Sequence, residues 1–183
     1  MEKVAPPKSV QRELPYFTVT QMAAIVNAAK TQLNRALFAL AAGTGARAGE
    51  LFALRVETDV NLNEQTITIR RSVFDGKENT SKSDTGDEDR TRTVPIDASV
   101  AMELKKHLRR RRYGYLFETR NGTPLRLSNV LEHKLQPVLQ KLKLVEPGMG
   151  MHAVGEAGFL TLFIRGEPSG HPRLVRTFFG QDG

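Results

Sequence analysis

The segment "TGARAGELFAL", residues 44–54, places Arg47 in a turn of small residues between two stretches with helical spacing. An arginine in the first turn of a helix is electrostatically unfavourable, because the amino-terminal end of the helix dipole is already positive. Arg47 therefore needs an anion. Glu50, one turn later, is one candidate, as a structural ion pair. A bound phosphate is the other, since a guanidinium group and exposed helix amides bind phosphate together.

A dinucleotide-binding interpretation of the same segment fails on its context. Residues 43–48 fit Gly-x-Gly-x-x-Ala, a variant of the dinucleotide fingerprint. That fingerprint follows a strand and opens a helix, whereas a stretch with helical spacing precedes it here. We therefore do not expect a nucleotide site.

Apolar residues at helical intervals predict helices on both sides of this segment. Thr18 and Gln21 have the spacing of a capping box at the first helix, and Gly43 is the expected stop of the second. Pro137 must kink or split the last helix, because proline lacks a backbone N–H group. The predicted helices cover residues 17–30, 31–43, 47–54, 97–112 and 128–144.

The chain changes to a strand period after the third helix. Thr66 and Thr68 alternate with Ile67 and Ile69, and residues 90–96, "RTRTVPI", form a second strand-like stretch. The polar residues 75–89 between them predict a loop. The expected fold class is α+β, mainly α, with a small three-stranded antiparallel sheet.

Composition limits the classes of protein that remain. The chain has 183 residues, no cysteine and a net charge of +7. This length suits one domain, and the absence of cysteine excludes disulfides and thiolate zinc sites. We find no signal peptide and no apolar run near the roughly 18 residues of a membrane span, so we expect a cytoplasmic protein without a membrane partner. The basic charge favours a polyphosphate partner, although a merely soluble basic protein has the same composition.

Four features in order carry a resemblance to a known family. They are "TGARAGELFAL", "DVNLNEQTITIRRSV", "SKSDTGDEDRTRTVPI" and "MHA". Over residues 17–153, the first two resemble the first arginine box and the β-hairpin of the tyrosine recombinase (phage integrase) catalytic domain. The third resembles the hairpin lysine of that domain with its Arg-x-Val-Pro strand, and the fourth resembles the start of its His-x-x-Arg box. The resemblance implies that the partner is double-stranded DNA.

The family's chemistry is phosphoryl transfer without a metal or other cofactor. A tyrosine attacks a DNA phosphate, giving a 3′-phosphotyrosyl link and a free 5′-hydroxyl group. Carried over by position, the resemblance implies catalytic roles for Arg47, Lys82 and His152, with Lys77 as a weaker candidate for the hairpin lysine. Arginine would neutralise charge on the nonbridging oxygens, lysine would protonate the leaving oxygen, and histidine would assist proton transfer.

The pattern fails after His152. The family's second arginine and a following histidine correspond to Gly155 and Glu156, and no tyrosine follows in the chain. Glycine has no side chain to bind phosphate, and glutamate would repel it. We therefore expect this chain to be inactive. A frameshift just after Ala153 would explain both the lost motif and the Gly- and Phe-rich tail, and a divergent natural segment is the alternative.

The sequence thus predicts an arm or linker at residues 1–16, an incomplete integrase-like domain at 17–153 and an atypical tail at 154–183. The chain starts where the family's catalytic domain starts, so we expect weak, salt-sensitive DNA binding without the N-terminal domain that grips the other face of the DNA. Further expected DNA contacts are Arg90, Arg92, Arg109, Arg110, Arg111 and Arg112. Cations at a helix end or on a strand are also common without a ligand.

Two other functions stay open from sequence alone. One is a noncatalytic DNA-binding regulator that kept the scaffold and competes for recombination sites. The other is an interaction protein whose Phe-rich tail docks on another subunit, which would make self-association independent of salt. Loss of salt-sensitive DNA binding on substituting Arg47 would favour either of the DNA-binding functions over the third.

Overall fold

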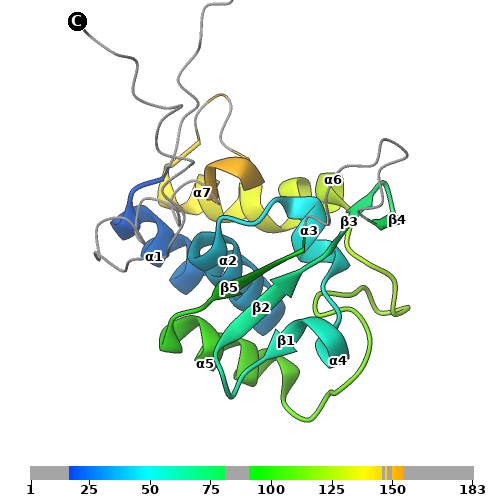
Figure 1. The fold of residues 1–183 in the computed structure, drawn as a ribbon. Helices are drawn as coiled ribbons and strands as arrows, with labels where there is room; N and C mark the ends of the chain where they lie inside the picture. The colour runs from blue at the N-terminus through cyan, green and yellow to red at the C-terminus, as the bar shows by residue number, and fades with distance from the viewer. Residues whose placement is uncertain (1–16, 81–90, 146, 148–149, 155–183) are drawn as a thin grey trace, which may run out of the picture.

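Helices surround a small sheet in the computed structural model, which describes residues 17–80, 91–145, 147 and 150–154 (Figure 1). The helices are α1 (Val19–Ala28), α2 (Gln32–Thr44), α3 (Ala48–Ala53), α4 (Val56–Asp59), α5 (Ala98–Leu108), α6 (Leu127–Val130) and α7 (Gln136–Leu142). The strands are β1 (Val60–Asn61), β2 (Thr66–Ile69), β3 (Arg71–Phe74), β4 (Lys77–Thr80) and β5 (Arg92–Pro95). In the part of the chain that the structure describes, no helix combines the length and the apolar character of a membrane span.

The expected three-stranded antiparallel sheet is present, in the order β1-β2-β5. Ile67 lies at its centre, paired with Val60 on one side and Val94 on the other. Ile67 and Ile69 are buried, whereas Thr66 and Thr68 on the other face are partly exposed. The period of two in the sequence therefore reports correctly which face of β2 packs on the core.

A second, two-stranded antiparallel sheet is formed by β3 and β4. The two strands are joined by Asp75 and Gly76, whose φ angles of 47° and 77° are typical of a type I′ hairpin turn. The loop predicted over residues 75–89 is therefore wrong in its first part, where Lys77–Thr80 is a strand. The remainder of that loop, residues 81–89, lies outside the described residues.

The core is built around α2, which lies between α1 and α5 (Figure 1). Four phenylalanines from different parts of the chain are almost completely buried in it: Phe17, Phe38, Phe52 and Phe117. The predicted capping box of α1 is present. The backbone N–H group of Gln21 donates to Thr18 Oγ1 at 3.2 Å, and the backbone N–H group of Thr18 donates to Gln21 Oε1 at 2.8 Å. This cap fixes where α1 begins, next to the buried Phe17.

The stop of α2 differs from the prediction. Gly45, not Gly43, ends the helix, with a φ angle of 62° and an N–H group that bonds to the Ala41 carbonyl at 3.1 Å. Gly43 lies inside the helix and faces Val100 of α5. Only the later glycine takes the left-handed conformation that closes a helix, so the helix continues through Thr44 and ends two residues before Arg47.

The predicted interruption of the last long helix is present, but it lies just before Pro137 and not at it. A π-helical segment, Leu131–Leu135, separates α6 from α7, and the N–H group of Gln136 bonds to the carbonyl of Leu131. Pro137 follows within the first turn of α7. Proline cannot donate to the preceding turn, so the irregular turn lies where a regular helix would lose a hydrogen bond anyway.

A buried polar cluster joins α2 to α5. The Glu103 carboxylate accepts hydrogen bonds from Gln32 Nε2 at 2.8 Å, Lys106 Nζ at 3.0 Å and Arg35 Nε at 3.3 Å. Burial alone would raise the pKa of Glu103, but these three donors outweigh it and lower the pKa to about 2. The carboxylate is therefore ionised at neutral pH and holds the two helices in register.

Candidate phosphate-binding site

Arg47 lies at the N-cap of α3, one residue before the first helical turn in which it was expected. Its backbone is extended, and its N–H group donates to Glu50 Oε2 at 2.8 Å. An arginine side chain has no acceptor, so this bond is one half of a capping box. The Arg47 side chain takes no part in the cap and is exposed.

Glu50 is occupied by a different arginine. Arg92 on β5 binds the Glu50 carboxylate in a bidentate manner: Nη1 donates to Oε1 at 3.0 Å, and Nη2 donates to Oε2 at 2.7 Å. Within the described residues, no carboxylate forms an ion pair with the Arg47 guanidinium. Of the two anions considered for Arg47, the ion pair with Glu50 is therefore not formed. Arg92 joins β5 to α3, and its expected contact with DNA stays a prediction.

Glu50 is the residue of this site that sequence reasoning undervalued. Its carboxylate satisfies the N-cap amide of Arg47 and the Arg92 side chain at once, and only 14% of the Glu50 side chain is exposed. The capping-box spacing between Arg47 and Glu50 was visible in the sequence. The partner from β5, 42 residues away, was not.

The other expected catalytic residues are placed less completely. Lys82 and Arg90 lie outside the described residues, and Lys77 is exposed at the start of β4. His152 is exposed in a helical turn, residues 151–154, whose other three side chains are buried in the core. No contact between His152 and Arg47 is present, so the assembly of these residues into one site remains a prediction.

The basic run Arg109–Arg112 follows the end of α5, and its members differ. Arg111 donates to the Leu116 carbonyl at 2.6 Å and forms an ion pair with Glu118. Arg109, Arg110 and Arg112 are exposed. Arg111 thus holds the chain that leaves α5, and a DNA contact by any of the four arginines stays a prediction.

Neither described tyrosine lies in a catalytic arrangement with Arg47. Tyr113 is 75% exposed, and the Tyr115 hydroxyl donates to Glu78 Oε2 at 2.8 Å. Burial and this hydrogen bond raise the pKa of Tyr115, which disfavours the phenolate form needed in a nucleophile. Tyr16 lies outside the described residues.

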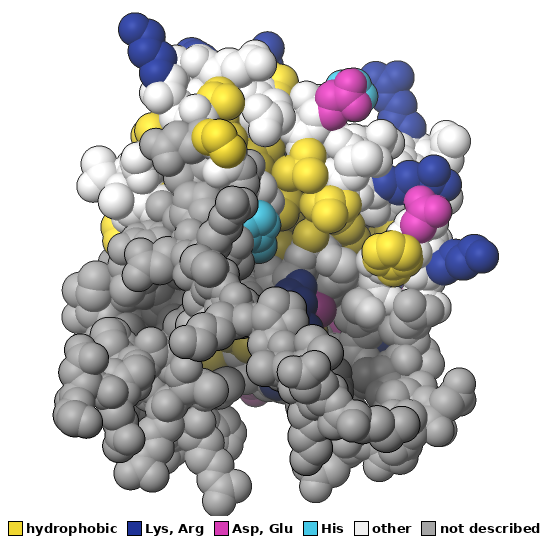
Figure 2. Space-filling view, turned by 90° about the horizontal axis from the view of Figure 1, so that it is seen from above, with side chains coloured by type: hydrophobic (Ala, Val, Ile, Leu, Met, Phe, Trp, Pro, Cys, Tyr) yellow, Lys and Arg dark blue, Asp and Glu magenta, His cyan; other side chains and the backbone are white. Residues whose placement is uncertain are grey.

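A cleft of about 360 Å³ lies between α3 and the β3–β4 hairpin. Its lining is mainly apolar and includes Phe52, Val73 and Leu125, with Arg126 as its one cation and Asp75 as its one carboxylate. Figure 2, which views the molecule from above, shows hydrophobic side chains near the centre of that face and Lys and Arg side chains around them. An apolar cleft with balanced charge does not favour phosphate, and Arg47 is not among its lining residues.

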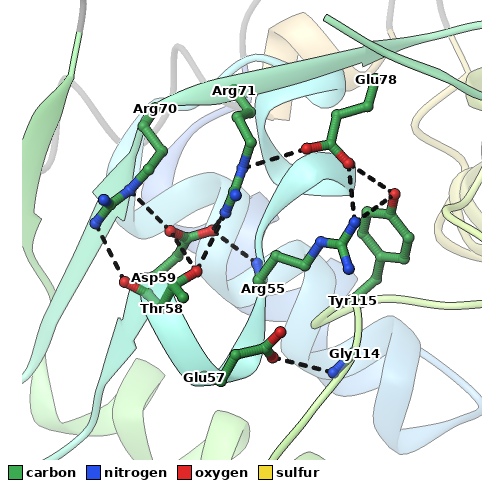
Figure 3. A network of polar contacts seen from close by, with 9 residues as sticks. All are labelled: Arg55, Glu57, Thr58, Asp59, Arg70, Arg71, Glu78, Gly114 and Tyr115. Carbon is green, nitrogen blue, oxygen red and sulfur yellow. Dashed lines mark hydrogen bonds and ion pairs between the residues drawn. The ribbon is translucent and has the colours of Figure 1, made fainter. Parts of the chain in front are cut away.

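A buried carboxylate lies below the hairpin and was not expected from the sequence. Asp59, whose side chain is 1% exposed, pairs with Arg70 at 3.0 Å and with Arg71, and it accepts the backbone N–H of Arg55 at 2.8 Å (Figure 3). Asp59 therefore supplies one negative charge that two adjacent arginines share at the junction of β2 and β3, and Arg71 also lies 3.5 Å from Glu78 Oε1.

The comparison with protein families decides what kind of domain this is. The model described as "Phage integrase family" matches residues 15–152, which is most of the chain. The chain belongs to the phage integrase family. This match confirms the family membership that the four sequence motifs indicated.

Individual relatives agree with the family assignment. A tyrosine recombinase XerC-like protein from Caldanaerobacter subterraneus subsp. tengcongensis is 29% identical over 187 aligned positions, covering 89% of this chain and 47% of the relative. The phage integrase family domain therefore spans about half the length of that relative.

Solved structures share the fold at low sequence identity. The XerA recombinase has a TM-score of 0.67 at 21% identity, covering 88% of this chain and 54% of the other. The Tn1549 transposon integrase in complex with a circular intermediate DNA has a TM-score of 0.69 at 15% identity, covering 87% and 56%. A lambda integrase dimer bound to a core site has a TM-score of 0.62 at 15% identity, covering 87% and 44%. They confirm the mainly helical α+β fold.

Proposed function

We propose that this chain is the DNA-binding, catalytic-domain part of a site-specific tyrosine recombinase, and that Arg47 is its principal phosphate contact. The supporting observation is the state of Arg47: its side chain is exposed, while the nearest carboxylate, that of Glu50, is bound by Arg92. A guanidinium group without a carboxylate partner is suited to a DNA phosphate, which it can bind through two parallel hydrogen bonds. Double-stranded DNA is the proposed partner, and a cytoplasmic location is proposed with it.

The family's reaction assigns the remaining roles. Arg47 would neutralise the charge that develops on the nonbridging phosphate oxygens, as expected for a preorganised cation. Lys82 would protonate the leaving oxygen, and His152 would assist proton transfer. These roles follow from position in the family motifs.

We also propose that this chain does not cleave DNA. Gly155 and Glu156 occupy the positions of the second arginine and its following histidine. Tyr115 supports this view, since its hydroxyl is engaged by Glu78 and its pKa is raised by burial and by that bond. A frameshift just after Ala153 is the proposed origin of the loss, and a divergent natural segment is the alternative.

Substituting Arg47 with alanine is expected to weaken binding to a duplex about tenfold at moderate salt, the loss of one good phosphate contact. The slope of log affinity against log salt should fall by about one, because one fewer counterion is released. Fluorescence anisotropy with a labelled duplex at several salt concentrations measures both quantities.

Arg120→Ala is the matched control, because Arg120 is an exposed arginine without an ion pair among the described residues. It should leave both the affinity and the salt slope nearly unchanged. If Arg47→Ala and Arg120→Ala weaken binding equally, Arg47 is only one of many surface charges and the proposal fails.

The alternative function is a noncatalytic DNA-binding regulator on the same scaffold, favoured by Gly155 and Glu156. Incubation with a nicked duplex, followed by denaturing electrophoresis, separates inactive from active chains. We expect no covalent protein–DNA adduct. An adduct that disappears in Tyr113→Phe would refute inactivity and identify the attacking residue.

The nucleotide sequence of the source locus tests the proposed frameshift. It should be translated in all three frames from codon 150 to beyond the stop codon. Another frame that encodes Arg-His, then Gly-His and then a tyrosine would support a shifted recombinase. If no frame does so, the tail is the protein's own and the regulator becomes the preferred function.

A further inference from the structure

Strand β4 is weakly supported by its own sheet. Among the described residues it pairs only with β3, in a sheet of two strands. An isolated two-stranded hairpin is marginally stable in water, so tertiary contacts must hold it. On β3, Val73 is 6% exposed and its carbonyl lies against Gly49 of α3. On β4, the Glu78 side chain contacts Arg55 and Tyr115, which lie outside the hairpin.

Glu78 Oε2 is held by Arg55 and Tyr115, and we call these three residues the Glu78 clamp (Figure 3). The other carboxylate oxygen, Oε1, lies 3.5 Å from Arg71 Nε on β3, within the same hairpin. Arg55 Nη2 donates to Glu78 Oε2 at 3.0 Å, and the Tyr115 hydroxyl donates to the same oxygen at 2.8 Å. Arg55 Nη2 also donates to the Tyr115 hydroxyl at 3.0 Å, with its guanidinium carbon 4.0 Å from the centre of the tyrosine ring. Each member therefore contacts both others.

Arg55 and Tyr115 belong to the rigid part of the domain. They face each other as an isolated antiparallel bridge, and the Leu116 N–H group bonds to the Leu54 carbonyl at 2.7 Å. Leu54 and Leu116 are both buried in the core. The clamp thus joins β4 to Arg55 and Tyr115, which lie next to these two core residues.

The charges of the clamp are matched. Burial alone would raise the pKa of Glu78, but the hydrogen bonds from Tyr115 and Arg55 outweigh it, and the pKa is lowered. The hydrogen bond that Arg55 donates to Glu78 likewise raises the pKa of Arg55. The carboxylate is therefore ionised at neutral pH, and its contacts are charge-assisted hydrogen bonds, which are stronger than neutral ones.

Lys77 is the cation whose direction the clamp sets. Successive side chains of a strand point to opposite faces, so holding Glu78 toward the domain turns Lys77 the other way, where it is exposed. Lys77 pairs with Phe74 across the hairpin, and the neighbouring pair is Val73 with Glu78. The Val73 carbonyl of the hairpin packs on Gly49 of α3, and Gly49 lies two residues from Arg47. The hairpin is therefore in direct contact with the helix that carries Arg47 at its N-cap.

We propose that Arg55, Glu78 and Tyr115 are positioning residues that hold the β3–β4 hairpin so that Lys77 contacts a DNA phosphate beside the one bound by Arg47. The inference rests on the proposed function, since it requires duplex DNA as the partner. None of the three clamp residues touches the DNA in this arrangement. Their effect on binding therefore passes through Lys77.

A double-mutant cycle tests the proposal in the full chain. Glu78→Gln keeps the size of the side chain but removes its charge, and it should weaken duplex binding about threefold to tenfold. In the Lys77→Ala background the same substitution should change affinity by less than about twofold. In the Arg47→Ala background its full effect should persist. Tyr115→Phe should give a smaller loss with the same dependence on Lys77, and Glu132→Gln, at an exposed glutamate, should give none.

A tyrosine absorbance titration reports on the clamp without DNA. The pKa of Tyr115, identified by comparison with Tyr115→Phe, should fall in Glu78→Gln, because Glu78 raises it. Unchanged DNA affinity in Glu78→Gln, or an equal loss with and without Lys77, would overturn the positioning role. If wild-type protein does not bind DNA, the proposed function fails and the role of Lys77 fails with it, whereas the titration would still show whether the clamp exists.

Discussion

Replacing Asp59 with alanine is expected to lower the free energy of unfolding by about 3 kcal/mol, because the change leaves Arg70 and Arg71 without their shared anion. The Asp59 side chain is 1% exposed and also accepts the Arg55 backbone N–H at 2.8 Å. Removing one partner of a buried ion pair costs far more than removing an exposed one. Urea denaturation followed by circular dichroism measures the loss, with the slope against urea expected to stay unchanged.

Glu64→Ala is the control for this substitution. Glu64 is an exposed carboxylate in the turn before β2, without an ion pair among the described residues, so its loss should change stability by less than about 0.5 kcal/mol. Equal losses for Asp59→Ala and Glu64→Ala would contradict the importance of burial. A loss below about 1 kcal/mol for Asp59→Ala would show that water replaces the carboxylate at the two arginines.

Gly49→Ala is expected to destabilise the protein by about 2 kcal/mol, although alanine normally favours a helix over glycine. A Cβ atom at position 49 would lie 2.7 Å from the Val73 carbonyl oxygen, so α3 and β3 would have to separate. Because this contact supports both Arg47 and the hairpin, DNA affinity should fall together with stability. Denaturation and anisotropy titration on the same preparation measure the two effects.

Gly43→Ala provides the comparison within a helix. Its added Cβ would lie 3.0 Å from a methyl group of Val100, a side chain that can shift, whereas the neighbour of Gly49 is backbone. The expected change is within about 1 kcal/mol of wild type, with DNA affinity retained. A loss for Gly43→Ala as large as for Gly49→Ala would mean that any bulk in these helices is harmful.

Much of the fold could be predicted because its signals are local. The cap at Thr18, the helical spacing in α2 and the alternation of Ile67 and Ile69 each depend on residues a few positions apart. Strand β4 was missed because its polar composition outweighed the Asp75-Gly76 dipeptide, which is itself a strong hairpin signal. Gly43 was preferred to Gly45 because periodicity locates a helix end only to within a residue or two.

The candidate site divides in the same way. Arg47 could be found because its motif is contiguous. The contacts around it join residues that are distant in sequence. Arg92 is 42 residues from Glu50, Glu78 is 23 residues from Arg55, and Tyr115 is 37 residues from Glu78. A basic residue looks the same in a sequence whether a carboxylate neutralises it or not. Arg92 was therefore expected on DNA, and the structure pairs it within the protein.

The π-helical segment between α6 and α7 has a consequence for how this region tolerates changes in length. Val130 and Leu135 are five residues apart, a spacing that a regular helix would place on different sides, yet both are fully buried. The wider turn accommodates one additional residue and returns the next side chain to the core. An alignment of this chain with a relative whose helix is regular should therefore show a one-residue gap in the relative within positions 131–135. This chain would then carry a one-residue insertion that leaves the packing of the core unchanged.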